Sequence, residues 1–160
     1  MNFKVFIRNI FIVTVATLML SACATKTATL PSQIQGDVYT GTDTVEYLAK
    51  GVPDRVFFAT NESVLTTASR DTLRKQAAWM RTNDSLSFTI EGHADERGTR
   101  EYNLALGERR ANAAKDYLMT YGISGNRLSV ISYGKERPVN SGSNPLAWSQ
   151  NRRSVTVKAN

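Results

Sequence analysis

The sequence predicts an α+β sandwich in which two main helices pack on a mixed sheet, in the order β-α-β-α-β-β. Two stretches have the apolar spacing of a helix, and four shorter stretches have the apolar content of strands. About 107 residues run from residue 54 to the last one, which suits a single domain with one hydrophobic core. Each helix then connects two strands by a crossover and covers one face of the sheet.

The first strand and the first helix follow from short apolar patterns. A buried strand is predicted over residues 55–60, which hold three consecutive apolar residues, Val56, Phe57 and Phe58. A helix is predicted over residues 68–81 from apolar residues spaced by four and three positions, Leu73, Ala77 and Met80. The polar pair Asn83-Asp84 ends this helix.

The remaining elements alternate in the same way. Strands are predicted over residues 86–91, 128–133 and 154–158, where apolar residues recur. Between the first two of these strands, a helix is predicted from Asn103, taken as its N-cap, to Tyr121, with Gly122 as its stop. Residues 137–150 contain two prolines and several Asn and Gly residues, so they are predicted to form a loop.

Residues 1–22 have the layout of an export signal. Lys4 and Arg8 lie in an N-terminal stretch without acids, an apolar run follows over residues 10–20, and two small residues come next. A transmembrane helix needs roughly 20 apolar residues, so this run is too short to be one.

The single cysteine of the chain, Cys23, directly follows this signal. A lone cysteine cannot form an internal disulfide. The pattern Leu-Ser-Ala-Cys resembles the bacterial lipobox, which implies that Cys23 carries a covalent lipid and becomes the mature N-terminus. Ala24, in place of an aspartate, favours the outer membrane and a domain that faces the periplasm. The alternative is an ordinary cleaved signal with an incidental cysteine.

Residues 23–53 are predicted to be the lipidated N-terminus and a flexible linker. The stretch from Ala24 to about Gly51 is rich in Thr, Ser, Gly and Gln and has few clustered apolar residues. As a flexible coil it would span on the order of 30 Å. The sequence therefore divides into a signal over 1–22, a tether over 23–53 and a domain over 54–160.

The chain without its signal is mildly basic. Without Lys4 and Arg8, 18 basic residues remain against 14 acidic ones, a net charge of +4. This charge suits an anionic partner such as a cell-wall polymer, although an ordinary solvated surface explains it equally well. Export from the cytoplasm argues against a nucleic-acid partner.

The second helix places an arginine where its apolar face should be. At 100° per residue, Arg110 falls in the middle of an apolar stripe made of Leu106, Ala113, Ala114, Tyr117 and Tyr121. A guanidinium aimed at the interior is costly unless it is paired. We therefore expect Arg110 to meet a carboxylate, from either the protein or a ligand.

The loop over residues 92–99, just before this helix, holds the complementary charge. Asp95 is a candidate partner for a ligand ammonium, and Thr99, Asn103 and free backbone amides can add hydrogen bonds. In the alternative reading, Asp95 and Arg110 pair with each other and only hold the loop.

Several motifs together point to a known family. Residues 57–63 read Phe-Phe-Ala-Thr-Asn-Glu-Ser, and residues 92–99 read Gly-His-Ala-Asp-Glu-Arg-Gly-Thr. Further motifs lie at residues 102–107, 109–111, 133–134 and 151–153. In combination they resemble the OmpA-like peptidoglycan-binding domain family over roughly residues 54–158. With the lipobox and the linker, they resemble in particular its branch of peptidoglycan-associated lipoproteins.

This resemblance implies non-covalent binding of the peptide stem of the cell wall, centred on meso-diaminopimelate. It assigns the ligand ammonium to Asp95 and the ligand carboxylate to Arg110. It also assigns the strand-end loop Ala59, Thr60 and Asn61, together with Asn103 and Leu106, to the same pocket. Arg152 or Arg153 contacts the wall or braces the pocket, and Arg153 is taken as the site residue.

The chain departs from the family pattern at two loop positions. Many members carry an aspartate where this chain has Asn61, and often an aromatic residue where it has Thr60. Asn61 keeps hydrogen-bonding capacity but carries no charge, so an ionic contact is not expected at this position.

The resemblance also implies partners and a cellular role. The protein is expected to tether the outer membrane to the wall within the Tol–Pal system, to bind the periplasmic protein TolB and other Tol proteins, and to support envelope integrity and cell division. The alternatives are an OmpA-like tether outside the Tol system and a wall-modifying enzyme. An enzyme is disfavoured, because His93 is the only histidine and no metal site or cofactor is expected beyond the lipid. An acid–base pair among Glu91, Asp95 and Glu96 is the remaining enzymatic option.

Overall fold

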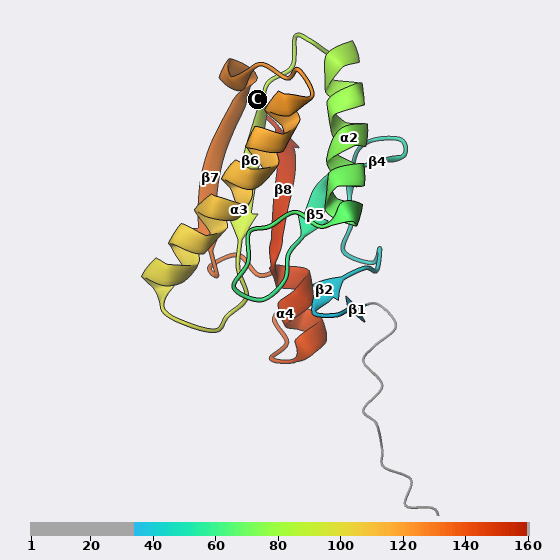
Figure 1. Cartoon of the computed structure of the whole chain (residues 1–160). Helices are drawn as coiled ribbons and strands as arrows, with labels where there is room; N and C mark the ends of the chain where they lie inside the picture. Colours follow the sequence, from blue (N-terminus) through green and yellow to red (C-terminus); the bar gives the residue numbers. More distant parts are fainter. Residues whose placement is uncertain (1–33, 160) are drawn as a thin grey trace, which may run out of the picture.

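A four-stranded mixed sheet with two long helices on one face forms the centre of the molecule. The computed structural model describes residues 34–159 (Figure 1). The strands lie in the order β5-β8-β6-β7, and only the β6–β7 pair of this sheet is parallel. Their bounds are Arg55–Phe57 (β5), Phe88–His93 (β6), Leu128–Gly134 (β7) and Arg153–Lys158 (β8). Helices α2 (Thr67–Thr82) and α3 (Arg100–Thr120) follow β5 and β6, which confirms the predicted α+β fold.

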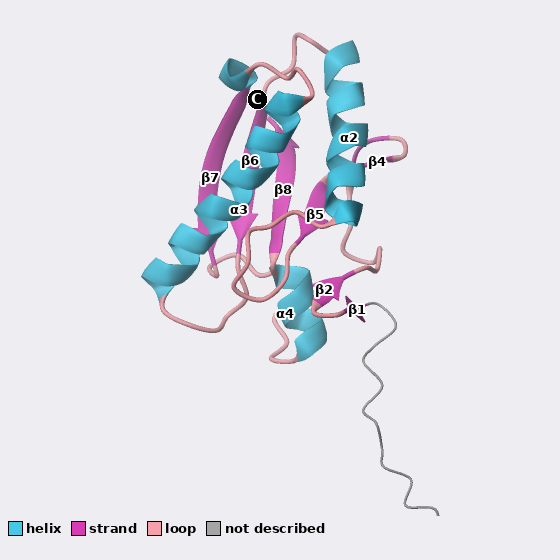
Figure 2. Ribbon diagram, viewed as in Figure 1, coloured by secondary structure: helices cyan, strands magenta, loops and turns pink. Residues whose placement is uncertain are grey.

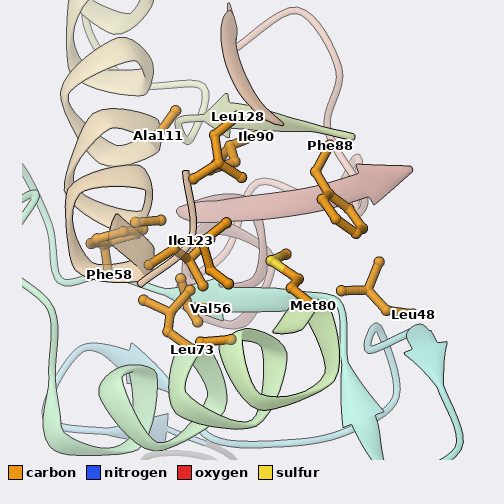
Figure 3. Packing of buried hydrophobic residues seen from close by; sticks show 13 residues of the cluster. Leu48, Val56, Phe58, Leu73, Met80, Phe88, Ile90, Ala111, Ile123 and Leu128 are labelled. Atoms are coloured by element: carbon orange, nitrogen blue, oxygen red, sulfur yellow. The ribbon is translucent and has the colours of Figure 1, made fainter. Parts of the chain in front are cut away.

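The hydrophobic core lies between the sheet and these two helices (Figure 3). The sheet contributes alternate residues of its strands, Val56, Phe88, Ile90 and Leu128. Helix α2 contributes Leu73, Ala77 and Met80, and helix α3 contributes Ala111, Ala114 and Leu118. Burial of one large apolar side chain stabilises a fold by about 1.5–3 kcal/mol, so this layer fixes both helices on the sheet.

Helix α3 begins earlier than the sequence predicted. Its N-cap is Thr99, whose side-chain oxygen accepts a hydrogen bond from the backbone N–H of Tyr102 at 3.2 Å. Asn103 lies within the first turn and is buried, so its expected role as N-cap is wrong. The amide of Asn103 instead donates to the carbonyl oxygens of Arg97 and Thr99, at 2.7 and 3.1 Å.

The segment predicted to be a loop over residues 137–150 contains a short helix, α4 (Pro145–Asn151). Asn144 caps it by accepting a hydrogen bond from the backbone N–H of Ala147 at 3.0 Å. Proline is favourable at the first position of a helix, where its missing N–H costs nothing. The asparagine and proline that suggested a loop therefore start a helix here.

The segment before the domain is folded over residues 34–53. Two small antiparallel pairs occur there, β1 (Ile34–Gln35) with β2 (Val38–Tyr39) and β3 (Tyr47–Ala49) with β4 (Val52–Pro53) (Figure 2). Buried Ile34, Tyr39 and Leu48 are too scattered in sequence to suggest a core, yet each packs once Gly36 and Gly51 turn the chain at positive φ. The prediction of a flexible linker is wrong for this part, because buried apolar residues and polar contacts of Asp37 hold it on the domain.

The predicted signal over residues 1–22, the lipidation site Cys23 and the first part of the linker lie outside the described residues. Among residues 34–159, no helix is long and apolar enough to cross a membrane. The same residues contain no group of three or more His, Cys, Asp or Glu side chains placed to hold a metal ion.

Candidate functional site

The candidate site lies where the loops after β5 and β6 meet the start of α3. A cavity of about 540 Å³ opens there, lined by Thr60, Asn61, Arg97, Gly98, Thr99 and Tyr102. Three of the predicted site residues, Thr60, Asn61 and Thr99, are therefore brought together. A smaller cavity of about 200 Å³ adjoins it, and Thr60 and Arg97 line both.

Arg110 is buried beneath this site and binds the backbone. Its side chain is 0% exposed. Its guanidinium donates to the carbonyl oxygens of Glu62 at 2.8 Å, His93 at 2.9 Å and Ala59 at 3.0 Å. Burial, and next the charge of Arg152, lower the pKa of Arg110 to about 10, so it stays protonated at neutral pH.

Three carbonyl oxygens thus take the place of a protein carboxylate at Arg110, and its binding of a ligand carboxylate stays a prediction. The alternative reading, in which Asp95 pairs with Arg110, is also wrong for the described structure. The arginine instead joins the loop after β5 to the end of β6, and it lines neither cavity.

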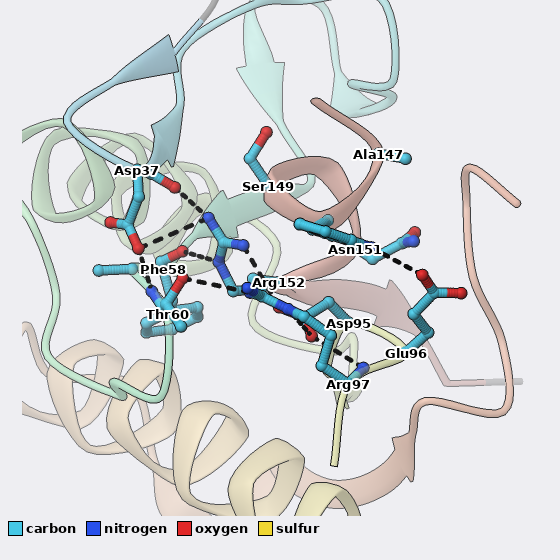
Figure 4. Close-up of polar contacts among 12 residues, drawn as sticks. Asp37, Phe58, Thr60, Asp95, Glu96, Arg97, Ala147, Ser149, Asn151 and Arg152 are labelled. Carbon is cyan, nitrogen blue, oxygen red and sulfur yellow. Dashed lines mark hydrogen bonds and ion pairs between the residues drawn. The ribbon is translucent and has the colours of Figure 1, made fainter. Parts of the chain in front are cut away.

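Asp95 forms its ion pairs with two other arginines (Figure 4). Arg97 donates from Nε to Oδ1 at 3.0 Å and from Nη2 to Oδ2 at 2.6 Å, which is a bidentate pair. Arg152 donates from Nη1 to Oδ2 at 3.3 Å. Asp95 is only 7% exposed, so both of its oxygens are covered by these partners.

The environment of Asp95 keeps it ionised. Burial alone would raise its pKa, but the hydrogen bonds from the side chain and backbone of Arg97 and the charge of Arg97 outweigh burial. The pKa of Asp95 is therefore held below its ordinary value of 3.8. A carboxylate that stays charged suits the binding of a cation better than the donation of a proton, as an acid–base catalyst requires.

Arg97 and Trp148 were not predicted to be site residues. The guanidinium of Arg97 lies 4.4 Å from the centre of the Trp148 ring, and Trp148 Nε1 donates to Glu96 Oε1 at 2.8 Å. Arg97 Nη2 also reaches Thr60 Oγ1 at 3.3 Å. The signal available in the sequence was the position of Arg97 inside the motif over residues 92–99.

Arg152, and not Arg153, lies at the site. Besides its bond to Asp95, Arg152 donates to the carbonyl oxygen of Phe58 at 3.1 Å and to that of Asp37. Arg153 donates weakly to the carbonyl oxygens of Asn151 and Arg137, at 3.4 and 3.2 Å. Arg153 lines neither cavity, because consecutive residues at the entry to a strand point in opposite directions, and its contact with the wall stays a prediction.

Of the other predicted residues, Asn61 lines the larger cavity, whereas Asn103 and Leu106 are buried and line neither cavity. Asn61 is exposed and adopts φ 56°, a left-handed conformation that asparagine tolerates better than most residues. Asn103 is buried and holds the carbonyl oxygens of Arg97 and Thr99. Leu106 is also buried, and its contact with a ligand stays a prediction.

A sequence model of the OmpA family matches residues 57–152. The chain belongs to the OmpA family. Within that family it falls among the peptidoglycan-associated lipoproteins. The match spans all the loops that form the two cavities except the segment before β5.

Curated relatives of this chain carry the name peptidoglycan-associated lipoprotein. The protein of Rhizobium meliloti (strain 1021) is 47% identical over 152 residues, which cover 92% of this chain and 86% of the relative. The protein of Brucella melitensis biotype 1 is 46% identical over 146 residues, which cover 88% of this chain and 86% of the relative.

Solved structures share the fold. The peptidoglycan-associated lipoprotein from Burkholderia pseudomallei is 34% identical, with a TM-score of 0.65 over 66% of this chain and 90% of that chain. The C-terminal domain of Helicobacter pylori MotB is 18% identical, with a TM-score of 0.62 over 67% of this chain and 84% of that chain. The second likeness concerns the fold alone.

Proposed function

We propose that this protein is an outer-membrane lipoprotein that binds peptidoglycan without covalent chemistry and so ties the membrane to the wall. One observation carries the proposal: the buried, ionised carboxylate of Asp95 is paired with Arg97, whose side chain is 42% exposed and lines the larger cavity. The names of the relatives support the same conclusion.

The free end of meso-diaminopimelate, in the peptide stem of the wall, is a zwitterion with one ammonium and one carboxylate. Asp95 would bind the ammonium by a charge-assisted hydrogen bond, which is roughly twice as strong as a neutral one. The hydroxyl of Thr60 and the first turn of α3 would contact neighbouring polar groups. Asn61, in place of an aspartate, would contribute through its amide and backbone.

The anchor in this proposal is a lipid on Cys23, which places the domain in the periplasm facing the wall. Ten residues separate Cys23 from Ile34. Ten extended residues span at most about 35 Å. Residues 34–53 pack on the domain and add nothing to the length of the tether. The greatest distance between the site and the membrane would therefore be shorter than with a flexible linker that ran to residue 53.

We also propose that the protein acts within the Tol–Pal system. The resemblance to peptidoglycan-associated lipoproteins supports TolB and other Tol proteins as partners, and a contribution to envelope integrity and cell division. Co-purification of TolB with this protein from membranes would test it. A protein that binds sacculi but never retains TolB would be a wall tether outside the Tol system.

Sacculus binding tests the wall-binding site. Purified peptidoglycan sacculi should pull down the wild type, and Asp95→Asn should lose at least about tenfold in affinity, as expected for a lost charge-assisted bond. Asp116→Asn removes the same charge from the exposed face of α3 and should bind like the wild type. Circular dichroism would verify that both variants fold. Undiminished binding by a folded Asp95→Asn variant would contradict the assignment.

Two further measurements separate the parts of the proposal. Cys23→Ser should release the protein from membranes while sacculus binding remains, because the anchor and the binding site are separate. The pure domain should release no soluble fragments from sacculi. Measurable release would favour a wall-modifying enzyme instead.

A further inference from the structure

We propose that a further cavity, between the β1–β2 hairpin, strand β5 and the start of α2, binds an N-acetylated amino sugar of the glycan strand of the wall. This β5 cavity has a volume of about 530 Å³ and shares no lining residue with the two cavities of the candidate site. Cavities of about 300–1,000 Å³ commonly hold small ligands, so one or two sugar units would fit. The inference rests on the proposed binding of peptidoglycan and adds a separate sugar site to it.

The lining of the β5 cavity offers no charge that is free to pair with a ligand. Arg55 is the one charged residue among those that line it. Its guanidinium donates from Nε and Nη2 to the two carboxylate oxygens of Asp54, at 2.8 and 2.7 Å, and Glu46 lies 3.5 Å away. Because this guanidinium is buried and already paired, the cavity suits an uncharged ligand.

The same lining combines apolar and hydroxyl groups. The buried lining residues include Tyr39, Val56 and Phe57. The exposed or half-buried ones carry hydroxyl groups at Thr40, Thr42, Tyr47, Thr67 and Thr72. A sugar ring has the same division, because its C–H faces are apolar and its edge carries hydroxyl groups. Tyr47 is 57% exposed, so its ring is free to stack on one face of a sugar.

Strand β5 turns unpaired backbone groups towards this cavity. The carbonyl oxygen of Asp54 and the N–H of Phe58 bond to β8, at 2.8 and 2.9 Å. Backbone groups alternate in direction along an antiparallel strand, so those of Arg55 and Phe57 point away from β8, on the side of the cavity. The carbonyl oxygen of Phe57 accepts a hydrogen bond from Ser69 Oγ at 3.0 Å.

The remaining groups of this edge match an acetamido group. Within residues 34–159, the N–H of Phe57 and both backbone groups of Arg55 form no hydrogen bond. An acetamido group carries one N–H and one C=O, as a peptide unit does, so it can pair with such a strand edge. Its methyl group would pack on the apolar part of the lining. An N-acetylated sugar therefore fits this cavity better than a sugar with hydroxyl groups alone.

The β1–β2 hairpin stands between the β5 cavity and the candidate site (Figure 1). Gln35 lines the β5 cavity, whereas Ile34 and Asp37 line the smaller cavity of the candidate site. Neighbouring strands lie about 4.8 Å apart, so a two-stranded hairpin is on the order of 10 Å across. Diaminopimelate is the third residue of the stem, and three extended residues also span about 10 Å. One unit of the wall polymer can therefore reach both places.

Glycan strands without stem peptides test this site separately. Such strands, released from sacculi by an amidase, would be added to the ¹⁵N-labelled protein, and maltotetraose would serve as a neutral sugar without acetamido groups. In NMR spectra, the amide signals of Arg55 and Phe57 should shift with the glycan strands and not with maltotetraose. The amide signals of Thr60 and Gly98, in the candidate site, should stay in place with both.

A substitution in the lining measures what the cavity contributes. Ala68, exposed on the first turn of α2, lines the β5 cavity, so Ala68→Gln would partly fill it with a side chain that favours a helix. In calorimetry the affinity for glycan strands should fall at least about fivefold, while that for the stem peptide stays within about twofold. Ala78→Gln, the same change at an exposed position of α2 outside this cavity, should leave both affinities unchanged.

The outcomes separate this inference from the proposed function. If glycan strands leave the Arg55 and Phe57 signals unshifted in a protein that still binds sacculi, the sugar site is wrong and the wall-binding function stands. Equal shifts with maltotetraose, or an Ala68→Gln variant with wild-type affinity for glycan strands, would also overturn the sugar site. A protein that binds glycan strands but not the stem peptide would support the sugar site and contradict the assignment of diaminopimelate to Asp95.

Discussion

The carboxylate of Asp37 accepts a hydrogen bond from the backbone N–H of Thr60 at 2.6 Å, so the segment before the domain reaches the wall of the site. The same carboxylate lies 3.8 Å from Arg152 Nη2, and Arg152 in turn donates to Asp95. Burial would raise the pKa of Asp37, but the hydrogen bonds from Thr60 and the charge of Arg152 lower it. The tether and the site are therefore connected by a continuous set of polar contacts.

Asp37→Ala should release the β1–β2 hairpin from the domain. The bond to Thr60 and the proximity to Arg152 are lost together, although the half-exposed carboxylate limits the cost to about 1 kcal/mol. Hydrogen–deuterium exchange should show faster exchange over residues 34–40 and at Thr60. Asp84→Asn, at an exposed position after α2, should leave exchange unchanged there. Equal protection in Asp37→Ala would mean that apolar contacts alone hold the hairpin.

The crossing of β6 and α3 requires two glycines. A Cβ added to Gly92 would lie 1.8 Å from the carbonyl oxygen of Gly107, which is backbone and cannot move aside. Gly92→Ala should therefore lower the free energy of unfolding by more than about 3 kcal/mol, as measured by urea denaturation. Gly125→Ala, whose Cβ would meet only the flexible end of Met119 at 3.2 Å, should change it by less than about 1 kcal/mol. Similar losses in the two variants would contradict this account of the crossing.

The sheet and its two helices could be predicted from sequence because local periodicity determines them. The alternation through Phe88 and Ile90 and the helical spacing of Leu73, Ala77 and Met80 all belong to the observed core. The start of α3 was misplaced because Thr99 and Asn103 are both good caps. Only the folded loop shows that Thr99 accepts the capping bond, while Asn103 is buried against the loop.

At the site, sequence reasoning found the right charges but not their partners. The helical position of Arg110 correctly indicated a buried cation, yet backbone carbonyls from two distant loops satisfy it. Such carbonyls carry no signal in the sequence, because every residue has one. Arg97 has the opposite problem, since an arginine in a polar loop looks like an ordinary surface residue until Asp95 is placed beside it.

Arg110 should behave as a structural residue. Arg110→Met keeps much of the packing volume but leaves the carbonyl oxygens of Ala59, Glu62 and His93 without their donor. The free energy of unfolding should fall by at least about 3 kcal/mol in urea denaturation. Arg109→Met, at the exposed neighbouring position, should change it by less than about 0.5 kcal/mol.

The Arg110→Met variant also distinguishes a structural role of Arg110 from direct contact with the ligand carboxylate. A fully stable Arg110→Met variant that no longer binds sacculi would make Arg110 the direct partner of the ligand carboxylate. Loss of stability together with faster exchange over residues 59–62 would place its effect on the loop that forms the cavity wall.

The stability of the domain should depend on His93 between pH 6.5 and about 4. The imidazole is 2% exposed, and neither ring nitrogen has a hydrogen-bond partner among residues 34–159. Burial, followed by the charges of Arg153 and Arg55, lowers its pKa to about 3. The imidazole of the unfolded chain therefore takes up a proton near pH 6.5, whereas that of the folded chain takes one up only near pH 3. The free energy of unfolding consequently falls as the pH is lowered through this range.

The slope at His93 should approach about 1.4 kcal/mol per pH unit below pH 6. His93→Gln removes the titrating group, so the difference in unfolding free energy between wild type and variant should shrink by that slope from pH 6 to pH 4. Asp95 does not interfere, because its pKa is lowered from 3.8 and its ion pairs are lost only below that pH. Urea denaturation at half-unit steps of pH would measure both curves. Parallel curves would show that the imidazole is protonated in the folded domain, paired with Glu91, whose Oε2 lies 3.5 Å from its Nε2.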